Sequence, residues 1–507
     1  MPTESPTRPR AQAGVAGALA VLSGLAAGHL VAGWLDPDAS PALAVGSRVI
    51  DLTPTPVKEW AVATLGTLDK PFLIGGVLVA TLALGVLVGL LAQRRRLLIW
   101  VGPLVLTVIA AVAALVAPSA GPLAVVPAVV TGLVGTFTLW WFLRGHAKRP
   151  QEQGAPYALP RRAFLTGTAV AGVGSAAAIV AGQYLSTTQR RPMTVTLPRP
   201  TQSPATLPKG LDVKGIAPWV TPNRDFYRVD TSLIVPNVDV GDWRLTIDGM
   251  VDRPFTLTWD ELLALPMVER DITLNCVSNE VGGPYIGGAR WLGVRTKDLL
   301  ERAGVQAGAE QVLSRSVDGF TVSTPVQALT DDRQALIAVG MNGSPLPADH
   351  GFPARMITPG LYGYVGATKW LTQLTLTTYA AKAAYWTVRG WSDQGPVKPS
   401  SRIDTPASLA QLQAGQVMIA GSAWAQNIGV SKVQVRIDGG AWRDTELGPD
   451  GGIQYWRQWK YAWQASSGQH NLECRIIDKS KAEQVETIAP PFPNGSSGLQ
   501  SVVVTVN

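Results

Sequence analysis

The sequence predicts a multi-domain membrane protein, with an N-terminal region of five transmembrane helices, an α+β domain and a C-terminal β-sandwich. Three patterns support this organisation. Long apolar runs fill the N-terminal part, strand-like and helix-like segments alternate in the middle, and short strand patterns recur at regular spacing towards the end. The chain has 507 residues, of which 46% are hydrophobic, and this combination indicates a membrane component with at least two further domains.

Each apolar run is close to the roughly 20 residues that an α-helix needs to cross a bilayer. The first run is long, rich in Gly and Ala, and followed by no clear A-x-A-like cleavage site, so we expect it to remain as a membrane helix. The five runs are approximately Ala11–Leu35, Phe72–Ala92, Leu97–Ala117, Leu123–Leu143 and Ala163–Leu185.

Basic residues gather in the segments that flank these runs, and they account for the formal net charge of +7. By the positive-inside rule, the amino terminus, the Arg94–Arg96 loop and the Arg144–Arg162 loop lie in the cytoplasm, and the acidic Asp36–Lys70 loop lies outside. An odd number of spans then places everything after Leu185 outside the cytoplasm. Because the charge follows membrane topology, we expect no nucleic acid partner. The basic residues are Arg8, Arg10, Arg94, Arg95, Arg96, Arg144, Lys148, Arg149, Arg161 and Arg162.

The fifth run is preceded by RRAFLTG, from Arg161 to Gly167. A pair of arginines before an apolar Phe-Leu step resembles a twin-arginine export signal, here inside the chain. An ordinary positive-inside pair explains the same residues equally well. If the signal is used, the domain that follows crosses the membrane already folded.

Two domains follow the membrane region of residues 1–186. Residues 187–215 are rich in Pro and Thr with little periodicity, so we expect a linker. Residues 216–395 should form an α+β domain, because helical stretches such as WDELLAL and RTKDLLERAGV alternate with strand patterns. These strand patterns are WRLTIDG, RDITLNC, TVSTPV, ALIAVGMNG and WLTQLTLTTY.

The last domain, residues 396–507, opens with the Pro-rich junction PVKPSSRIDTP. Regular strand spacing and turn signals such as Asp438-Gly439 predict a β-sandwich that is immunoglobulin-like in size. The expected strands are VMIAGSAWA, SKVQVRIDGGAW, WRQWKYAWQA, HNLECRIID and LQSVVVTVN.

The chain has two cysteines, and their contexts differ. Cys474 is in phase with Leu472 and Ile476 on a sandwich strand, so we expect a buried structural thiol. A disulfide with Cys276 is the alternative in an oxidising compartment. Because the two cysteines lie in different domains, we expect two separate thiols.

Cys276 ends the strand pattern DITLNC, and the loop SNEVGG after it offers backbone NH groups and close approach for a ligand. This context suits either a thiolate metal ligand or a nucleophile. A nucleophile would need a histidine base, and the histidines are few: His29, His146, His350 and His470. Zinc fits poorly because the chain has no CxxC and no clustered His and Cys ligands. A metal on Cys276 would therefore take its other ligands from a cofactor.

The stretch DHGFPARMITPG sets His350 and Arg355 in a loop constrained by Pro and Gly, and Lys369 follows in GATKW. Three cationic or donor groups on fixed loops suit a phosphate-bearing ligand. Taken alone, the same stretch is also compatible with a solvated loop carrying ordinary charges.

Several stretches follow one another in the order of a known family. They are LNCVSNEVGG with Cys276, ARWLGV with Trp291, MNGSPLPADHGFPAR, GATKWL and a final sandwich with IDGGAW. From about Pro218 to the end, the chain resembles the sulfite oxidase family of molybdopterin-dependent oxidoreductases. The resemblance covers both domains after the membrane region.

The resemblance implies a molybdenum–molybdopterin cofactor with Cys276 as the protein thiolate on the metal. It implies that the pterin and its phosphate are held by Phe226, His350, Arg355 and Lys369. It also implies catalytic roles for Arg228 in FYRVDT, Asp318 in SVDGF and Tyr385 in AAYW, which match the family's active-site arginine, aspartate and tyrosine.

Two departures from the family bear on the substrate. Sulfite-oxidising members carry paired arginines a few residues after the cysteine, where this chain has Glu280 and Val281. A further family arginine near the carboxyl terminus is missing from NGSSGLQSV. A dianion needs compensating charge when it is desolvated, so sulfite itself is a doubtful substrate.

The membrane helices should serve as an anchor or docking surface for a separate electron-transfer partner. A haem between helices would need two intramembrane histidines, and only His29 lies in a span. The sandwich makes a homodimer a further expectation, because the terminal domain often supports dimerisation in the family.

The sequence thus predicts a multi-pass protein of the cell membrane whose extracytoplasmic domain is a molybdenum-dependent oxidoreductase. We expect two-electron oxygen-atom transfer on a small sulfur-containing or related substrate. Two alternatives remain: a sulfoxide-type reductase on the same scaffold, and a cofactor-free binding or structural module.

Overall fold

The computed structural model describes residues 7–65, 68–117, 120–144, 161–189 and 195–507. The chain divides into two compact units. The first is Met1–Pro192 with Thr231–Pro236, and the second is Met193–Asp230 with Asn237–Asn507. Each unit has its own apolar core.

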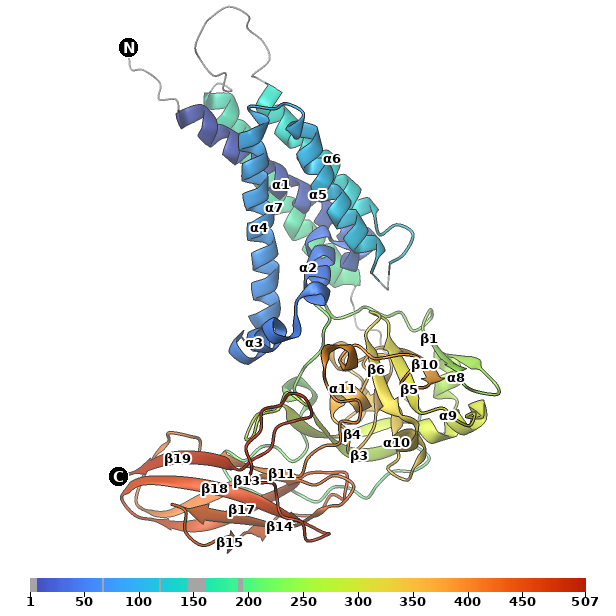
Figure 1. Ribbon diagram of the computed structural model, residues 1–507, viewed down its shortest axis with the longest axis vertical. Coiled ribbons are helices and arrows are strands. Elements are labelled where there is room, and N and C mark those ends of the chain that lie inside the picture. The colour runs from blue at the N-terminus through green and yellow to red at the C-terminus, as the bar shows by residue number, and fades with distance from the viewer. Residues whose placement is uncertain (1–6, 66–67, 118–119, 145–160, 190–194) are drawn as a thin grey trace, which may run out of the picture. The chain divides into compact units, whose positions relative to one another are not determined.

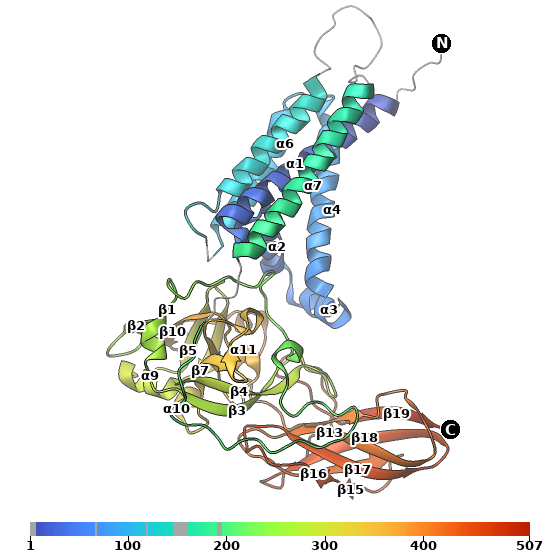
Figure 2. The same ribbon diagram turned by 180° about the vertical axis from the view of Figure 1, so that it is seen from behind.

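The first unit is a helix bundle (Figures 1 and 2). Its long helices are α1 (Thr7–Leu35), α4 (Asp69–Ala92), α5 (Leu98–Leu115), α6 (Val126–Leu143) and α7 (Arg161–Gln189). Among the described residues, five helices are long and apolar enough to cross a membrane: Arg10–Leu35, Asp69–Ala92, Leu98–Leu115, Val126–Leu143 and Arg162–Thr188. These five segments lie on the five apolar runs of the sequence.

Helix α1 packs against α4, α6 and α7, and glycines permit the close approach. A Cβ atom on Gly17 would collide with the backbone of Gly85 in α4, and one on Gly24 would collide with the carbonyl of Thr131 in α6. Gly33 faces Gly182 of α7 in the same way. Small residues let membrane helices pack backbone to backbone, so α1 is the central helix of this unit.

The described residues of the expected Asp36–Lys70 loop form helices. The segment contains η1 (Pro37–Ala39), α2 (Pro41–Leu52) and α3 (Thr55–Leu65). Pro41 starts α2, where its missing NH costs nothing, and the helix buries Ala44 and Gly46. Residues 1–6, and residues 145–160 of the expected cytoplasmic loop, lie outside the described part of the chain.

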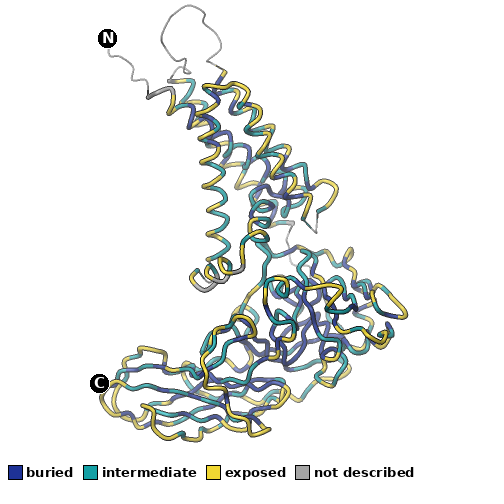
Figure 3. Tube along the Cα trace, in the orientation of Figure 1, coloured by how far each residue is buried: buried dark blue, intermediate teal, exposed yellow. Residues whose placement is uncertain are grey.

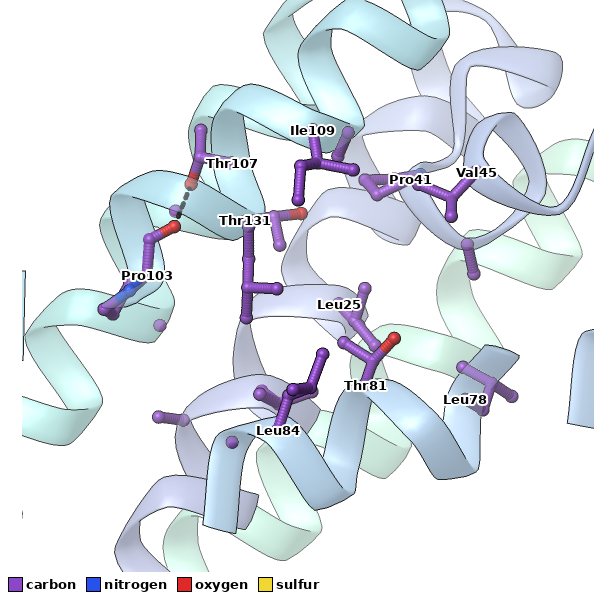
Figure 4. A pocket seen from close by; sticks show the side chains of 18 of the residues that line it. Leu25, Pro41, Val45, Leu78, Thr81, Leu84, Pro103, Thr107, Ile109 and Thr131 are labelled. Atoms are coloured by element: carbon purple, nitrogen blue, oxygen red, sulfur yellow. Dashed lines mark hydrogen bonds between the residues drawn. The ribbon is translucent and has the colours of Figure 1, made fainter. Parts of the chain in front are cut away.

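A cavity of about 280 Å³ lies within the first unit, lined by residues of α1, α2, α4, α5 and α6. Figure 4 shows apolar side chains such as Leu25, Leu84 and Ile109 around it. Three threonine hydroxyls on its wall donate hydrogen bonds to the carbonyl four residues earlier in their own helix: Thr81, Thr107 and Thr131. The wall of the cavity is therefore almost entirely hydrocarbon.

The second unit begins with the α+β domain, which contains two sheets. One sheet has the order β2-β1-β10-β5-β6, and the other has the order β3-β4-β7-β8 with β9 paired to β7. The strands of the first are β1 (Arg244–Gly249), β2 (Phe255–Thr258), β5 (Gln311–Ser316), β6 (Thr321–Pro325) and β10 (Leu371–Thr377). Those of the second are β3 (Val268–Asn275), β4 (Ile286–Arg295), β7 (Leu336–Met341), β8 (Ser344–Pro345) and β9 (Arg355–Ile357).

Four short helices join these strands, and local sequence explains where they start and stop. They are α8 (Trp259–Leu263), α9 (Thr296–Ala303), α10 (Val326–Thr330) and α11 (Gly363–Gly366). Thr258 and Glu261 form a capping box at the start of α8. Gly304 ends α9 in a left-handed conformation, at a φ of 72°. The expected strands and both expected helices of this domain are present.

The structure differs from the expected linker of residues 187–215 in its described part, from residue 195 onwards. Residues from 195 onwards already pack on the α+β domain, since Val195 and Leu197 contact its core. Thr201 donates a backbone hydrogen bond to Met267, and Gln202 forms a bridge with Val268 at the edge of β3. The segment lacks periodicity because it follows the surface of the domain without forming a strand of its own.

The C-terminal part is the expected sandwich of two sheets. One sheet contains β11 (Ser400–Thr405), β13 (Gly415–Trp424), β17 (Arg457–Ala465) and β16 (Glu446–Leu447). The other contains β12 (Gln411–Leu412), β19 (Gln500–Val506), β18 (Gly468–Asp478), β14 (Val430–Ile437) and β15 (Arg443–Asp444). Cys474 on β18 is fully buried in the sandwich core, as its phase predicted, and both cysteines are free thiols.

An aromatic seam joins the α+β domain to the sandwich within the second unit. Its buried residues come from both domains: Trp219, Val277, Ile286, Tyr362, Trp391, Val397, Trp424, Tyr455 and Trp456. The Tyr455 hydroxyl and the Trp456 indole each donate a hydrogen bond, 2.8 Å long, to the Trp219 carbonyl. Buried strands on both sides of this seam appear dark blue in Figure 3. The two domains are therefore one packed body.

The close packing of α1 makes a testable prediction. Gly24→Ala should destabilise the protein by about 1–3 kcal/mol, because the new methyl group meets the Thr131 carbonyl. Gly172→Ala is the matched control, since a Cβ there meets nothing within 4 Å and alanine favours the helix. Thermal unfolding in detergent measures both variants. Equal melting temperatures for the two would contradict the packing described.

Candidate functional site

Cys276 lies directly after β3, at the end of a hairpin with β4. Its NH donates to the Tyr285 carbonyl at 2.9 Å, and its carbonyl accepts from the NH of Asn279 at 3.1 Å. The buried Asn279 side chain accepts from the NH of Tyr285 at 2.8 Å. Below the loop, Asp271 and Arg290 on facing strands form a 2.7 Å ion pair. These contacts hold the thiol in one place at the end of the sheet.

The Cys276 thiol is 8% exposed, and its surroundings act on its pKa in opposite directions. Burial raises the pKa, whereas hydrogen bonds from Ser278 and the charge of Lys369 lower it. A metal ion would remove the proton outright, because a coordinating thiol binds as thiolate. The site thus shields the thiol while placing a cation close enough to favour its anion.

His350 in η5 (Ala348–His350) is 2% exposed. Its Nε2 donates to the Asn223 carbonyl at 2.9 Å, which fixes the tautomer because a carbonyl only accepts. Nδ1 is then an acceptor, and it has no hydrogen-bond partner among the described residues. Burial lowers the pKa of this imidazole, so it is a neutral group at physiological pH.

Arg355 at the start of β9 is a buried cation, 5% exposed, with no carboxylate among its described contacts. Its Nη1 donates to the His350 carbonyl at 3.0 Å, and its guanidinium lies 5.3 Å from the centre of the Trp291 ring. Its Nε has no partner among the described residues. Burial lowers the pKa of Arg355 to about 10. A buried guanidinium with an unused donor is suited to an anionic ligand.

Lys369 supplies a second buried cation. Its amino group donates to the Asp349 carbonyl at 2.8 Å and to Asp230 at 3.0 Å. Burial lowers its pKa to about 8, although the charge of Asp230 acts in the opposite direction. Asp230 also accepts from Nε of Arg228 at 2.9 Å, so one carboxylate holds two cations.

Phe226 and Trp291 form the apolar floor beside these cations. Phe226 meets Trp291 edge to face, with ring centres 5.8 Å apart, and lies 5.7 Å from the His350 ring. A side chain on Gly287 would collide with Phe226, so the glycine of β4 makes room for the ring. Tyr227 stacks on Phe226 with ring centres 5.3 Å apart. The FYR segment is thereby placed next to the cysteine loop.

Of the remaining two predicted residues, Asp318 lies on a second hairpin and Tyr385 packs against it. Asp318 is half-buried between β5 and β6, where burial raises the pKa of its carboxyl and the charge of Asp230 raises it further. Tyr385 packs on Phe320 of the same hairpin at 5.3 Å, and the Arg389 guanidinium lies 3.6 Å from its ring centre. These contacts place Tyr385 against the Asp318 hairpin.

Three further residues of this site carry no motif in the sequence. Asp230 follows FYRV, and only the fold brings it to Lys369. The Cys276 charge contributes to a raised pKa of the Tyr227 and Tyr362 phenols, after the larger effect of burial. The adjacency of Tyr227 to Phe226 was the one signal in the sequence.

The residues present fit a metal cofactor that brings its own ligands and a phosphate. No group of three or more His, Cys, Asp or Glu side chains among the described residues could hold a metal by itself, so Cys276 would contribute a single thiolate. The unused Nε of Arg355, with Lys369 nearby, suits the phosphate. The unpartnered Nδ1 of His350 suits a donor on the same ligand.

Comparison with known proteins agrees with this chemistry. A family model described as oxidoreductase molybdopterin binding domain matches residues 232–386, and one described as bacterial Ig domain matches residues 399–473. The oxidoreductase YuiH of Bacillus subtilis (strain 168), itself uncharacterized, is 32% identical over 157 residues, which are 31% of this chain and 76% of that protein. The chain belongs to the sulfite oxidase family of molybdopterin-dependent oxidoreductases. Its expected molybdenum–molybdopterin cofactor is confirmed by that membership.

Two further relatives show how far the likeness extends. Mitochondrial sulfite oxidase of Mus musculus is 30% identical over 323 residues, which cover 54% of this chain. The chain spans only 58% of the length of that relative. The crystal structure of the sulfane dehydrogenase SoxCD from Paracoccus pantotrophus shares the fold, with a TM-score of 0.50, 20% identity, and coverage of 60% of this chain and 93% of that one.

The two departures from sulfite-oxidising members of the family meet at the cysteine loop. Glu280 is exposed and Val281 half-buried on that loop. The segment Asn494–Gly498, where a family arginine was expected, lies against the same loop, because the Ser496 hydroxyl donates to the Asn279 carbonyl at 2.6 Å. The tertiary structure thus brings both departures, neither of which supplies a cation, to the cysteine loop.

The buried cation of Arg355 makes a first prediction for this site. Arg355→Gln should weaken retention of the cofactor by about 1.5–3 kcal/mol, because charge-assisted hydrogen bonds to phosphate are lost. Molybdenum and pterin content per chain measure the effect. Arg315→Gln, an exposed arginine on β5, is the control with the same change of charge. Full molybdenum content in Arg355→Gln would contradict the assignment.

The lowered pKa of Lys369 makes a second prediction. Lys369 is charged below about pH 8 and neutral above it, whereas its ordinary value is 10.5. Sulfate binding to cofactor-free protein should therefore weaken as pH rises from 7 to 9, and calorimetry measures it. Since the unfolded chain binds the proton more tightly, Lys369 should also make unfolding harder as pH rises from about 8 to 10.5. Lys369→Met should lose both pH dependences.

Proposed function

We propose that this chain is a membrane-anchored molybdenum enzyme whose extracytoplasmic domain carries out two-electron oxygen-atom transfer on a small sulfur-containing or related substrate. One observation carries the proposal: a buried thiol, Cys276, is held at a strand end beside the desolvated cations Arg355 and Lys369. Cations buried without full compensation are costly, and an anionic cofactor would repay that cost.

The roles of the protein residues follow from their placement. The bound molybdenum cofactor supplies the redox step and the transferable oxygen. Cys276 provides a fixed thiolate, and Arg355, Lys369 and His350 position the pterin and its phosphate. Phe226 excludes water from the same side.

Proton handling would fall to a residue of the second hairpin, whose charged neighbour is Asp230. Asp318, with its raised pKa, can hold or release a proton near the reacting atoms. Arg228 can orient a polar substrate atom, because its side chain is partly exposed. Tyr385, which packs against the Asp318 hairpin, would line the same side of the site as Asp318.

A second candidate function is reduction of a sulfoxide on the same scaffold. The cysteine loop at Glu280 and Val281 and the segment Asn494–Gly498 supply no cation, which favours a substrate that carries no negative charge at sulfur. Assays with artificial electron donors and acceptors, run in both directions, distinguish oxidation from reduction. Turnover of a sulfoxide with a reduced dye, without turnover of sulfite, would select the reductase.

A cofactor-free binding module is the third candidate. It would leave Arg355 buried with an unused donor and the His350 Nδ1 without a partner, at a cost of about 1–3 kcal/mol for each unsatisfied group. That cost is why we place it last. Molybdenum content of the purified protein decides the matter.

The location and partners follow from the membrane helices. Five helices of sufficient length and apolarity, with basic residues flanking them, support a multi-pass anchor and an extracytoplasmic catalytic domain. A separate protein would exchange electrons with the cofactor. The Arg161-Arg162 pair would direct export of the folded domain, and the sandwich would support a homodimer.

Substitution of each cysteine tests the proposal. Purified wild-type protein should contain about one molybdenum per chain. Cys276→Ala should lose activity by at least about a thousandfold with little change in melting temperature, because only the metal ligand is removed. Cys474→Ala is the control: it should keep activity but melt at a lower temperature, because it leaves a cavity in the sandwich core. Native protein without molybdenum would overturn the proposal.

A further inference from the structure

Asp230 occupies a central position among the charges of the site. Its side chain is 7% exposed, and it accepts from Arg228 Nε at 2.9 Å and from Lys369 Nζ at 3.0 Å. Its charge also raises the pKa of Asp318, after the larger effect of burial. A single buried carboxylate therefore faces both cations and the nearby acid.

Asp230 and the cofactor phosphate would between them engage the three cations of the site. Arg355 has an unused donor and no carboxylate among its described contacts, so it is the cation that the cofactor phosphate would take. Arg228 and Lys369 both pair with Asp230. With Asp230 in place, neither cation is available in full to a second anion.

The two segments next to the site supply no further cation that could bind a dianion. The cysteine loop from Cys276 to Tyr285 and the segment Asn494–Gly498 contain no Lys or Arg. Two cations touch them, and both are engaged. Arg402 donates to the Gly283 carbonyl and pairs with Asp404 at 2.6 Å, and Lys398 donates to Asn494 and Gly495.

We propose that Asp230 is a specificity-determining residue that neutralises Arg228 and Lys369, so that the loaded site rejects dianions such as sulfite and sulfate. An uncharged sulfoxide or thioether would enter without competing for these cations. A dianion would have to displace Asp230 from two ion pairs or share the cations with it. This inference rests on the proposed function, because it assumes that the cofactor phosphate occupies Arg355.

The test uses the molybdenum-loaded full-length protein in detergent and the isosteric variant Asp230→Asn. Sulfate binding is measured by calorimetry, and inhibition by sulfate is measured with an uncharged sulfoxide as substrate. Removal of the carboxylate frees Arg228 and leaves Lys369 balanced by the cofactor phosphate alone, so sulfate should bind roughly tenfold more tightly.

Two further variants separate the ion pair from general charge. Asp225→Asn makes the same change in net charge five residues away, at an exposed acid paired with Arg224, and should leave sulfate binding unchanged. Arg228→Gln in the Asp230→Asn background should return sulfate affinity towards that of the wild type. If both variants behave as expected, the effect of Asp230→Asn comes from the local ion pairs of Arg228, Asp230 and Lys369.

Three results would overturn the inference. Asp230→Asn could bind sulfate as weakly as the wild type while retaining molybdenum. It could lose molybdenum, which would make Asp230 part of the cofactor support. Asp225→Asn could match it, which would indicate the general field of the domain. Wild-type protein without molybdenum would refute the proposed function instead. Sulfate calorimetry on Asp230→Asn and Asp225→Asn would then still test whether Asp230 opposes sulfate binding.

Discussion

The burial of positive charge beside a single thiol is the constraint on which the rest of this site depends. Arg355 is almost completely enclosed, with a tryptophan face on one side and a backbone carbonyl as its described acceptor. Such a group is expensive in the absence of an anion. The surrounding strands, the glycine that makes room for Phe226 and the ordered cysteine loop keep Arg355 buried. An anionic ligand would offset the cost of that burial.

The aromatic seam explains why the sandwich belongs with the catalytic domain. Val277, the residue after Cys276, lies in the same apolar cluster as Tyr455 and Trp456 of the sandwich. The Trp456 NH also donates to the Thr273 hydroxyl on β3, three residues before the cysteine. The C-terminal domain thus supports the strand that presents the thiol, and its final loop closes over the cysteine loop. This packing offers a structural reason for the sandwich that is independent of dimerisation.

Asp230 indicates how proteins that share one scaffold can differ in substrate specificity. A carboxylate at this position changes which substrates can approach without touching the metal. Substrate selection by cancelling charge is compatible with both oxidation and reduction at sulfur.

The sequence by itself determined the apolar runs, the strand and helix patterns, the phase of Cys474 and the motif order that identifies the family. These properties are local, since they depend on periodicity and on short spacings. Tertiary structure alone decided that residues 195–215 pack on the domain, that Asp230 reaches Lys369, and that Asn494–Gly498 meets the cysteine loop. Tyr385 likewise needed the fold to place it on the Asp318 hairpin. Contacts between residues far apart in the chain, here by about 65 to more than 200 positions, leave no periodic trace in the sequence, because they arise only when separate strands and loops are packed together.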